Sequence, residues 1–279
     1  MTDFIMFAGP NGSGKSSARD AIVNPVEVVI DPDRIAREIK PSAPRSVDNP
    51  AAREALRRFD QNIAQRKSIS METTLTGHTA VMRLQQAKDA GYTVGLIYVA
   101  LNDPELNVLR VEERVRRGGH GIAPDVVRKR VGTSLANLPR ALAIADQAVV
   151  LDNSGKQHQR VMEVAAGRVT YLAEQLPKWL HDQMPEILTA LKTKPAPAPD
   201  SLEPPAKPRR SAVAGIFDAL RRPESTAPAP WTSPPVPMAE RLAVFERAAA
   251  EKAQKQKGRA AEPEPEGDIP PKPSKGPKP

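Results

Sequence analysis

The chain has 279 residues, no cysteine and a formal net charge of +8. The lack of cysteine excludes a disulfide scaffold and thiolate chemistry. Residues 1–192 and residues 193–279 each carry +4, a spread too even to indicate a nucleic-acid-binding face. The first residues lack the features of a signal peptide, and no apolar run reaches the ~20 residues of a membrane span. We therefore expect a cytoplasmic protein.

Proline divides the chain into two parts. Residues 1–192 hold 11 of the 30 prolines, and residues 193–279 hold the other 19. We predict one folded domain over residues 1–192, followed by a proline-rich disordered tail. Two amphipathic stretches in the tail, 211–222 and 238–256, are possible helices. They either dock on the domain or bind a partner.

Within the domain, short β-rich apolar runs alternate with helical patterns. Strands are predicted at 3–8, 26–30, 68–72, 92–101 and 147–152, and helices at 14–23, 50–67, 78–90, 104–117 and 124–145. Residues 160–174 are a candidate terminal hairpin. This alternation predicts an α/β fold with a mostly parallel sheet and right-handed crossovers. Ligands of such sheets bind at the carboxyl ends of the strands.

A phosphate-binding motif lies between the first predicted strand and helix. The residues Gly9-Pro10-Asn11-Gly12-Ser13-Gly14-Lys15-Ser16 fit the pattern G-x-x-x-x-G-K-[ST], and Ser17 follows. Backbone amides of such a loop surround phosphate oxygens, helped by the helix N-terminus. Lys15 is expected to reach the β- and γ-phosphates, and the Ser16 hydroxyl to bind Mg²⁺. The motif predicts ATP and Mg²⁺ as cofactors and a P-loop NTPase three-layer sandwich.

Acidic residues follow the second and third predicted strands. In "VIDPDRIA", one aspartate is expected to cap the next helix or to accept a proton from a hydroxyl, and the residues alone leave both roles open. In "METTLTGH", Glu72 is expected either to orient Mg²⁺ through water or to bind substrate. Thr76 is expected to cap the helix that follows.

The segment "RVEERVRRGGHGIAPDVVRKR" at 110–130 is rich in arginine and is interrupted by Gly118-Gly119. A phosphotransferase needs such a lid, because its arginines neutralise the transferring phosphoryl group and its closure excludes water. The alternative interpretation is a solvated helix face with Glu112 and Glu113 paired to arginines. We expect that alternative to hold for about half of these residues.

These segments together resemble the zeta-toxin-like P-loop kinases over about residues 3–180. The resemblance lies in "GPNGSGKSS", "VIDPDRIA", "METTLTGH", "GYTVGLIYVALNDPELNVLRVEERVRRGGHGIAPDVVRKR" and "SLANLPRALAIADQAVVLDNSG". It implies transfer of phosphate from ATP to a sugar hydroxyl of UDP-N-acetylglucosamine, and a small antitoxin that covers the nucleotide site.

The resemblance also implies roles for individual residues. Lys15 and Ser16 match the phosphate- and metal-binding pair, and Asp33 matches the general base. Glu72 and Thr74 match substrate-binding positions, and Arg114 matches the first of two lid arginines. The second lid arginine stays open, because "GGHGIAP" has no arginine where the family pattern expects one. The candidates for it are Arg117, Arg128 and His120.

Two other functions compete with a small-molecule kinase. The chain could instead be a nucleotide-dependent switch or ATPase that acts through its tail. It could also be a polynucleotide or nucleoside kinase whose basic lid grips nucleic acid, although little aromatic surface is present for base stacking.

Overall fold

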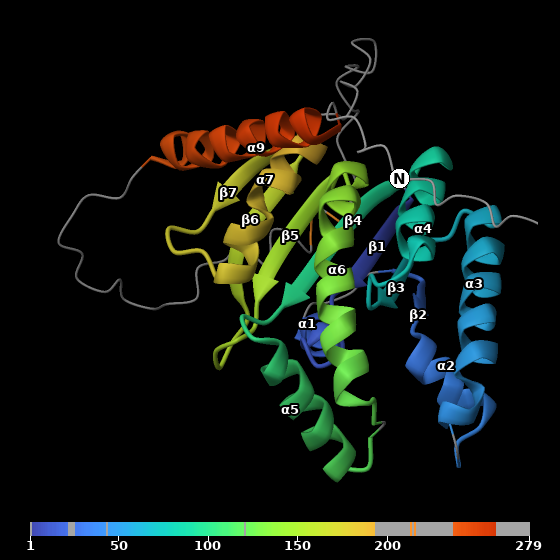
Figure 1. Cartoon of the computed structure of the whole chain (residues 1–279). Coiled ribbons are helices and arrows are strands. Elements are labelled where there is room, and N and C mark those ends of the chain that lie inside the picture. Colours follow the sequence, from blue (N-terminus) through green and yellow to red (C-terminus); the bar gives the residue numbers. More distant parts are fainter. Residues whose placement is uncertain are drawn as a thin grey trace, which may run out of the picture.

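The computed structural model describes residues 2–21, 26–42, 44–119, 121–192, 213, 215 and 237–260. Its centre is a seven-stranded sheet in the order β2-β3-β1-β4-β5-β6-β7 (Figure 1). The strands are β1 (Asp3–Ala8), β2 (Val28–Ile30), β3 (Ile69–Thr73), β4 (Thr93–Ala100), β5 (Gln147–Asp152), β6 (Gln159–Ala165) and β7 (Arg168–Leu172). The first five are mutually parallel, and β6 and β7 are antiparallel additions. The predicted α/β fold with a mostly parallel sheet is confirmed.

Helices follow the strands much as the sequence predicts. They are α1 (Lys15–Ala21), α2 (Pro32–Ile39), α3 (Asp48–Ala64), α4 (His78–Asp89), α5 (Pro104–Arg116), α6 (Pro124–Ile144), α7 (Lys178–Lys192) and α9 (Met238–Ala260), with a 3₁₀ turn at Pro44–Val47. The last two residues of the predicted helix 14–23 lie outside the described residues. Figure 1 shows α5 and the first part of α6 projecting past the carboxyl ends of the strands.

Alternate side chains of the central strands bury the two faces of the sheet, as the period of a strand requires. Phe4 and Met6 of β1 point to one face, where they join a core with α3, α4, α6 and α7. Ile5 and Phe7 point to the other face, where Ala18 of α1 packs against them. Residues 4–8 of β1 are fully buried on both faces of the sheet, which explains the apolar run that follows Asp3.

The structure adds elements at the carboxyl end of the predicted domain. The hairpin at 160–174 is confirmed, with Ala166 and Gly167 at positive φ in its two-residue turn. Helix α7 was not predicted. Its apolar residues recur at helical spacing and include the buried Trp179, Leu180 and Ile187, but Pro185 inside the helix obscures the pattern.

The second predicted tail helix is present as α9, which extends to residue 260 and packs against α7 (Figure 1). Phe245 is 8% exposed and stacks edge-on against His181 at 5.1 Å between ring centroids. Arg241 donates to the carbonyls of Leu172 and Ala173. The tail helix therefore contributes to the core of the sheet domain.

The other tail segment, 211–222, lies outside the described residues except for Val213 and Gly215. Val213 is fully buried on the face of the sheet that α1 covers, where it packs in one apolar cluster with Ile5, Phe7 and Ile97. The domain boundary at residue 192 stays a prediction. None of the helices in the described ranges has the length and apolar character that a membrane crossing requires.

Candidate active site

The strand register brings the sequence motifs to one edge of the sheet. Phe7 of β1 pairs with Glu72 of β3, and Ile30 of β2 pairs with Met71. The phosphate loop, the "DPD" turn and the threonines after β3 therefore begin at the same level of three neighbouring strands. This is the carboxyl edge, where a parallel sheet binds its ligands.

The loop between β1 and α1 has the backbone of a phosphate cradle. Gly12 has a φ of +77°, and a Cβ built there would lie 2.5 Å from the carbonyl oxygen of Asn107. Gly14 has a φ of +96°, and its Cβ would lie 2.2 Å from Nδ2 of Asn153. Only glycine fits at these two positions. The loop is therefore packed closely against Asn107 and Asn153 in a backbone conformation that depends on glycine. Such a loop before a helix N-terminus fits a nucleotide phosphate.

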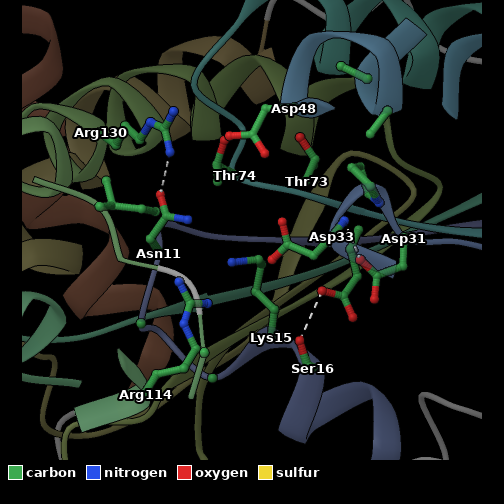
Figure 2. A pocket seen from close by; sticks show the side chains of 18 of the residues that line it. Asn11, Lys15, Ser16, Asp31, Asp33, Asp48, Thr73, Thr74, Arg114 and Arg130 are labelled. Carbon is green, nitrogen blue, oxygen red and sulfur yellow. Dashed lines mark hydrogen bonds between the residues drawn. The ribbon is translucent and has the colours of Figure 1, made fainter. Parts of the chain in front are cut away.

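Lys15 extends over this cradle, and its Nζ donates to the carbonyl of Pro10 at 3.0 Å. Burial lowers the pKa of Lys15, whereas the carboxylates of Glu72 and Asp33 act in the opposite direction. Figure 2 shows the amine at the centre of the pocket, between arginines and acidic side chains. A polyphosphate would replace the single carbonyl partner and favour the ammonium form.

Ser16 and Glu72, the two residues predicted to contribute to a Mg²⁺ site, are hydrogen-bonded to each other. The Ser16 hydroxyl donates to Oε2 of Glu72 at 3.1 Å (Figure 2). Burial raises the pKa of Glu72, and the negative charge of Asp31 raises it further. The described residues contain no group of three or more histidine and carboxylate ligands that would hold a metal ion alone. This donor set fits Mg²⁺, which binds through one or two protein oxygens together with nucleotide phosphates.

Arg19 of α1 holds these acidic residues and was not identified from the sequence. Its Nη1 lies 2.5 Å from Oε1 of Glu72 and 3.3 Å from Oδ2 of Asp31. The spacing of four residues from Lys15 places Arg19 one turn further along α1. No sequence signal distinguishes this arginine from an exposed one, because its partners follow two other strands.

The two aspartates after β2 have different roles. The Asp31 carboxylate caps α2 by accepting from the backbone amides of Asp33, at 3.0 Å, and Arg34, at 3.3 Å. Both aspartates line the pocket, but Asp33 does not cap the helix. The structure thus assigns the capping role to Asp31, and the proton-accepting role of Asp33 stays a prediction.

The threonines after β3 differ from expectation in one respect. Thr73 and Thr74 line the pocket. The prediction that Thr76 caps α4 is wrong, since Gly77 occupies the N-cap position and no side chain bonds to the helix amides. The Thr76 hydroxyl is within 2.9 Å of the Thr74 hydroxyl. It therefore supports a pocket side chain rather than a helix end.

Two of the three lid arginines predicted from the sequence line the pocket, and the third does not. Arg114 and Arg117 line it, although Arg117 also bonds Glu113 at 2.9 Å and is largely exposed. Arg128 does not line the pocket, because it pairs with Glu105 at 2.6 Å and with Asp125 at 2.7 Å. His120 lies outside the described residues.

Arg130 occupies the pocket instead of Arg128. Its Nη1 donates to Oδ1 of Asn11 in the phosphate loop at 3.0 Å (Figure 2). From α5, the buried Asn107 donates to the carbonyl of the same Asn11 at 2.7 Å. One residue of the phosphate loop therefore contacts both lid helices.

The loop after β5 completes the nucleotide side of the site. Asn153 is 9% exposed, and its Nδ2 donates to the carbonyl of Ser13 at 2.8 Å. Arg110 of α5 donates to the carbonyl of Asn153 at 2.8 Å. This contact joins a fourth strand end to the phosphate loop. Neither residue was predicted from the sequence to belong to the site.

One pocket of about 990 Å³ is lined by Lys15, Ser16, Asp33, Glu72 and Arg130, among others, and its volume is suited to a nucleotide with a second small molecule. The phosphate loop and the lid form one side. Helix α2, the first turns of α3 and the end of β3 form the other (Figure 2). Asp48 of α3, which the sequence analysis did not select, belongs to this second side.

A family model described as zeta toxin matches residues 2–158, more than half of the chain. The chain belongs to the zeta toxin family. A protein of Haemophilus influenzae described as uncharacterized is 42% identical over 126 residues, which are 45% of this chain and 90% of that protein. Membership of the zeta toxin family supports the kinase-type function predicted from the sequence.

Two solved structures are among those whose folds are similar to that of this chain. One, from the PezAT chromosomal toxin-antitoxin system of Streptococcus pneumoniae, is 15% identical over 69% of this chain and 88% of that chain, with a TM-score of 0.46. The other, AvrRxo1-ORF1:AvrRxo1-ORF2 with sulphate ions, is 14% identical over 79% of this chain and 81% of that chain, with a TM-score of 0.48. At these identities and TM-scores the two likenesses add nothing about chemistry.

Proposed function

We propose that this zeta toxin family member is an ATP-dependent kinase that transfers the γ-phosphate to a hydroxyl group of a small molecule. The observation that carries the proposal is the position of Asp33. Its carboxylate lines the same pocket as Lys15, on the opposite side from the lid arginines. A protein that only hydrolyses nucleotide has no need for a second, acidic half of its pocket.

The loop side of the pocket is suited to the phosphate donor. ATP with Mg²⁺ supplies the transferable phosphoryl group when bound, and Ser16 and Glu72 offer the oxygens that hold the metal. Backbone amides around Gly12 and Gly14 hold the phosphates, with Ser13 and Ser17 flanking them. Lys15 stabilises the negative charge of the β- and γ-phosphates.

Asp33 acts as the general base in this proposal. An aspartate within hydrogen-bond reach of a hydroxyl accepts its proton as the oxygen attacks, so the oxygen becomes a better nucleophile. Asp31 is committed to the cap of α2 and to Arg19. Because Asp31 has these partners, Asp33 is the aspartate that contacts the acceptor in this proposal, together with Thr74.

Arg114 and Arg130 are the proposed lid arginines. Both line the pocket, from α5 and α6 respectively. Guanidinium groups aimed at the transferring phosphoryl stabilise the charge that spreads over its oxygens. Arg117 is a peripheral contributor because Glu113 holds it. Arg128 fastens α6 to α5 through Glu105 and is no longer a candidate for substrate binding.

UDP-N-acetylglucosamine is the first acceptor to test, because the zeta toxin resemblance implies it. An antitoxin that covers the nucleotide site is the corresponding protein partner, and the cytoplasm is the compartment that such a system requires. These three assignments are proposals that rest on the family.

The test is transfer from γ-labelled ATP to separate pools of nucleotide sugars, free sugars and nucleosides. We expect label in an acceptor, with little free phosphate. Label that appears only as free phosphate would contradict a kinase. Label in oligonucleotides at low salt, lost steeply as salt rises, would instead indicate a polynucleotide kinase.

A further inference from the structure

The two lid helices, α5 and α6, are fastened to each other. Val108 and Val111 of α5 form a buried apolar cluster with Val127 of α6. On the outer surface, Arg128 of α6 pairs with Glu105 of α5 at 2.6 Å. Because such an apolar contact is closely packed, a displacement of one helix shifts the other. The lid therefore meets the rest of the site as one unit.

This unit contacts the phosphate loop at Asn11. The side-chain oxygen Oδ1 of Asn11 accepts from Nη1 of Arg130 at 3.0 Å, as Figure 2 shows. The backbone carbonyl of Asn11 accepts from Nδ2 of Asn107 at 2.7 Å. Asn107 is fully buried, so this second bond is shielded from water. The main chain of one loop residue thus holds α5, and its side chain holds α6.

The partner of Arg130 differs in charge from those of other lid arginines. Arg117 pairs with the carboxylate of Glu113 at 2.9 Å. Arg128 has its carboxylate partner in Glu105. Arg130 is half-buried and lines the pocket, and within the described ranges no ion pair joins it to a carboxylate. An uncharged amide oxygen orients the guanidinium without neutralising it, so its positive charge is left for a phosphate.

The backbone of the phosphate loop does not itself require an asparagine at position 11. The pattern G-x-x-x-x-G-K-[ST] sets no residue type there, because the loop binds phosphate through backbone amides. Asparagine is also favoured where φ is positive, but Asn11 is not among the described residues with positive φ. The contact that distinguishes the Asn11 side chain is the hydrogen bond with Arg130.

We propose that Asn11 is a positioning residue for phosphoryl transfer, whose side chain holds Arg130 beside the phosphate loop and directs it at the transferring group of ATP. The inference rests on the proposed kinase function and concerns the same site. A guanidinium has five N–H donors, so the bond to Asn11 leaves four for phosphate oxygens. An arginine held in place in this way loses little freedom when it meets the phosphoryl group.

Asn11→Ala removes the side chain and keeps the backbone amide that faces the phosphates. We expect kcat to fall by about tenfold to a hundredfold, the usual effect of a misplaced group, while the Kd for ATP hardly changes. Asn62→Ala is the matched control. The Asn62 side chain donates to the carbonyl of Arg58 within α3 and does not line the pocket, so this variant should leave kcat and Kd unchanged.

A double-variant cycle separates positioning from a general structural role. Independent residues multiply their effects on kcat, whereas a residue that acts through another has no further effect once that other is removed. We therefore expect Asn11→Ala to lower kcat in the wild type but not in an Arg130→Met background. In an Arg128→Met background the loss should persist in full. An equal loss in the Arg130→Met background, or an unchanged kcat in Asn11→Ala alone, would overturn the proposal.

Asn11→Asp tests whether the partner of Arg130 must be uncharged. This variant keeps an acceptor oxygen at the same place, but its negative charge neutralises the guanidinium. We expect kcat at saturating ATP to fall at least as far as in Asn11→Ala. A wild-type kcat in Asn11→Asp would contradict the requirement for a neutral partner.

The reaction measured distinguishes a failure of this inference from a failure of the kinase function. Transfer of label to an acceptor, with equal losses of kcat in both backgrounds, would overturn the role of Asn11 and leave the kinase function intact. Release of free phosphate alone by the wild type would contradict a kinase. The same cycle, measured on ATP hydrolysis, would then still decide the role of Asn11, because the γ-phosphoryl group leaves ADP in both reactions.

Discussion

The Ser16 hydroxyl donates a hydrogen bond of 3.1 Å to Oε2 of Glu72, across 56 residues of sequence. The other oxygen of the same carboxylate lies 2.5 Å from Arg19. Two residues of α1 therefore fix the orientation of Glu72 before any ligand arrives. In the proposed kinase, this oriented carboxylate and the serine hydroxyl would be the protein oxygens that hold a hydrated Mg²⁺ ion.

The burial of Glu72 beside Asp31 opposes folding stability at neutral pH, although Arg19 and Ser16 act in the opposite direction. Burial and Asp31 raise the pKa of Glu72 above its ordinary value, so the folded protein binds this proton more tightly than the unfolded chain does. Below the ordinary pKa, Glu72 is protonated in both the folded and the unfolded protein, and it does not reduce folding stability. As pH rises through the interval between the two pKa values, stability falls, and the loss is complete above the folded-state pKa.

Glu72→Gln should therefore raise the Tm of the ligand-free protein at pH 7 to 8, while it raises the Mg²⁺ concentration that activity requires. The gain in Tm should shrink toward pH 4, where Glu72 is protonated. Thermal denaturation across this pH range measures it. Glu112→Gln, which removes an exposed carboxylate of α5, is the control, and an equal gain in both variants would contradict the explanation.

Asp33→Asn should lower kcat by about 10²- to 10⁴-fold, the usual contribution of a general base. ATP affinity and Tm should hardly change, because Asp33 neither lines the phosphate cradle nor caps a helix. Single-turnover transfer and calorimetric ATP binding measure the two effects separately.

The contrasting variant is Asp31→Ala, which removes the cap of α2. It should cost about 1 kcal/mol of unfolding free energy, visible as a lower midpoint in urea. If Asp33→Asn destabilises the protein as much as Asp31→Ala does, the division of roles between the two aspartates is wrong.

Arg130→Met should reduce kcat by about 10²- to 10³-fold, as expected when one group that stabilises the transferring charge is removed. Arg128→Met should change kcat by only a few fold, since Arg128 is an exposed partner of Glu105 and Asp125. Steady-state kinetics at saturating ATP distinguish them. The reverse order of effects would return Arg128 to the site.

Val213→Asp should destabilise the protein by about 3 kcal/mol or more, because it buries a carboxylate in the apolar cluster of Ile5, Phe7 and Ile97. Val244→Asp is the matched control, since Val244 is 55% exposed on α9, and its effect should stay within about 0.5 kcal/mol. Denaturant unfolding of the full chain compares them. Equal stability of both variants would show that Val213 is not a core residue in solution.

Much of the fold can be predicted from the sequence, because parallel strands that are buried on both faces have continuous apolar sequences. β1 and β4 are examples, since both faces of each are covered. The phosphate loop is equally predictable, because its spacing sets the positions of Lys15 and Ser16 relative to a strand and a helix. Glu72 was selected for a related reason, as it lies near the end of β3, which neighbours β1 in the sheet.

The missing parts depend on contacts between distant segments. Arg130 and Arg128 are indistinguishable in the sequence, and the turn of α6 decides that one reaches Asn11 while the other reaches Glu105. Arg19 is recognisable only through its contacts with Asp31 and Glu72. Helix α7 was not predicted because Pro185 is unfavourable inside a helix. In the folded protein, the burial of its apolar face stabilises the helix despite this proline.

Val213 and Phe245 are both buried, although each lies far beyond the last strand of the sheet. A ribosome makes the nucleotide loop first and these two side chains much later. The newly made sheet therefore exposes apolar surface on both faces until the chain has grown past Phe245. Completion of the core is therefore delayed during protein synthesis. In this interval the phosphate loop has been made, but the apolar residues beside it are not yet fully covered.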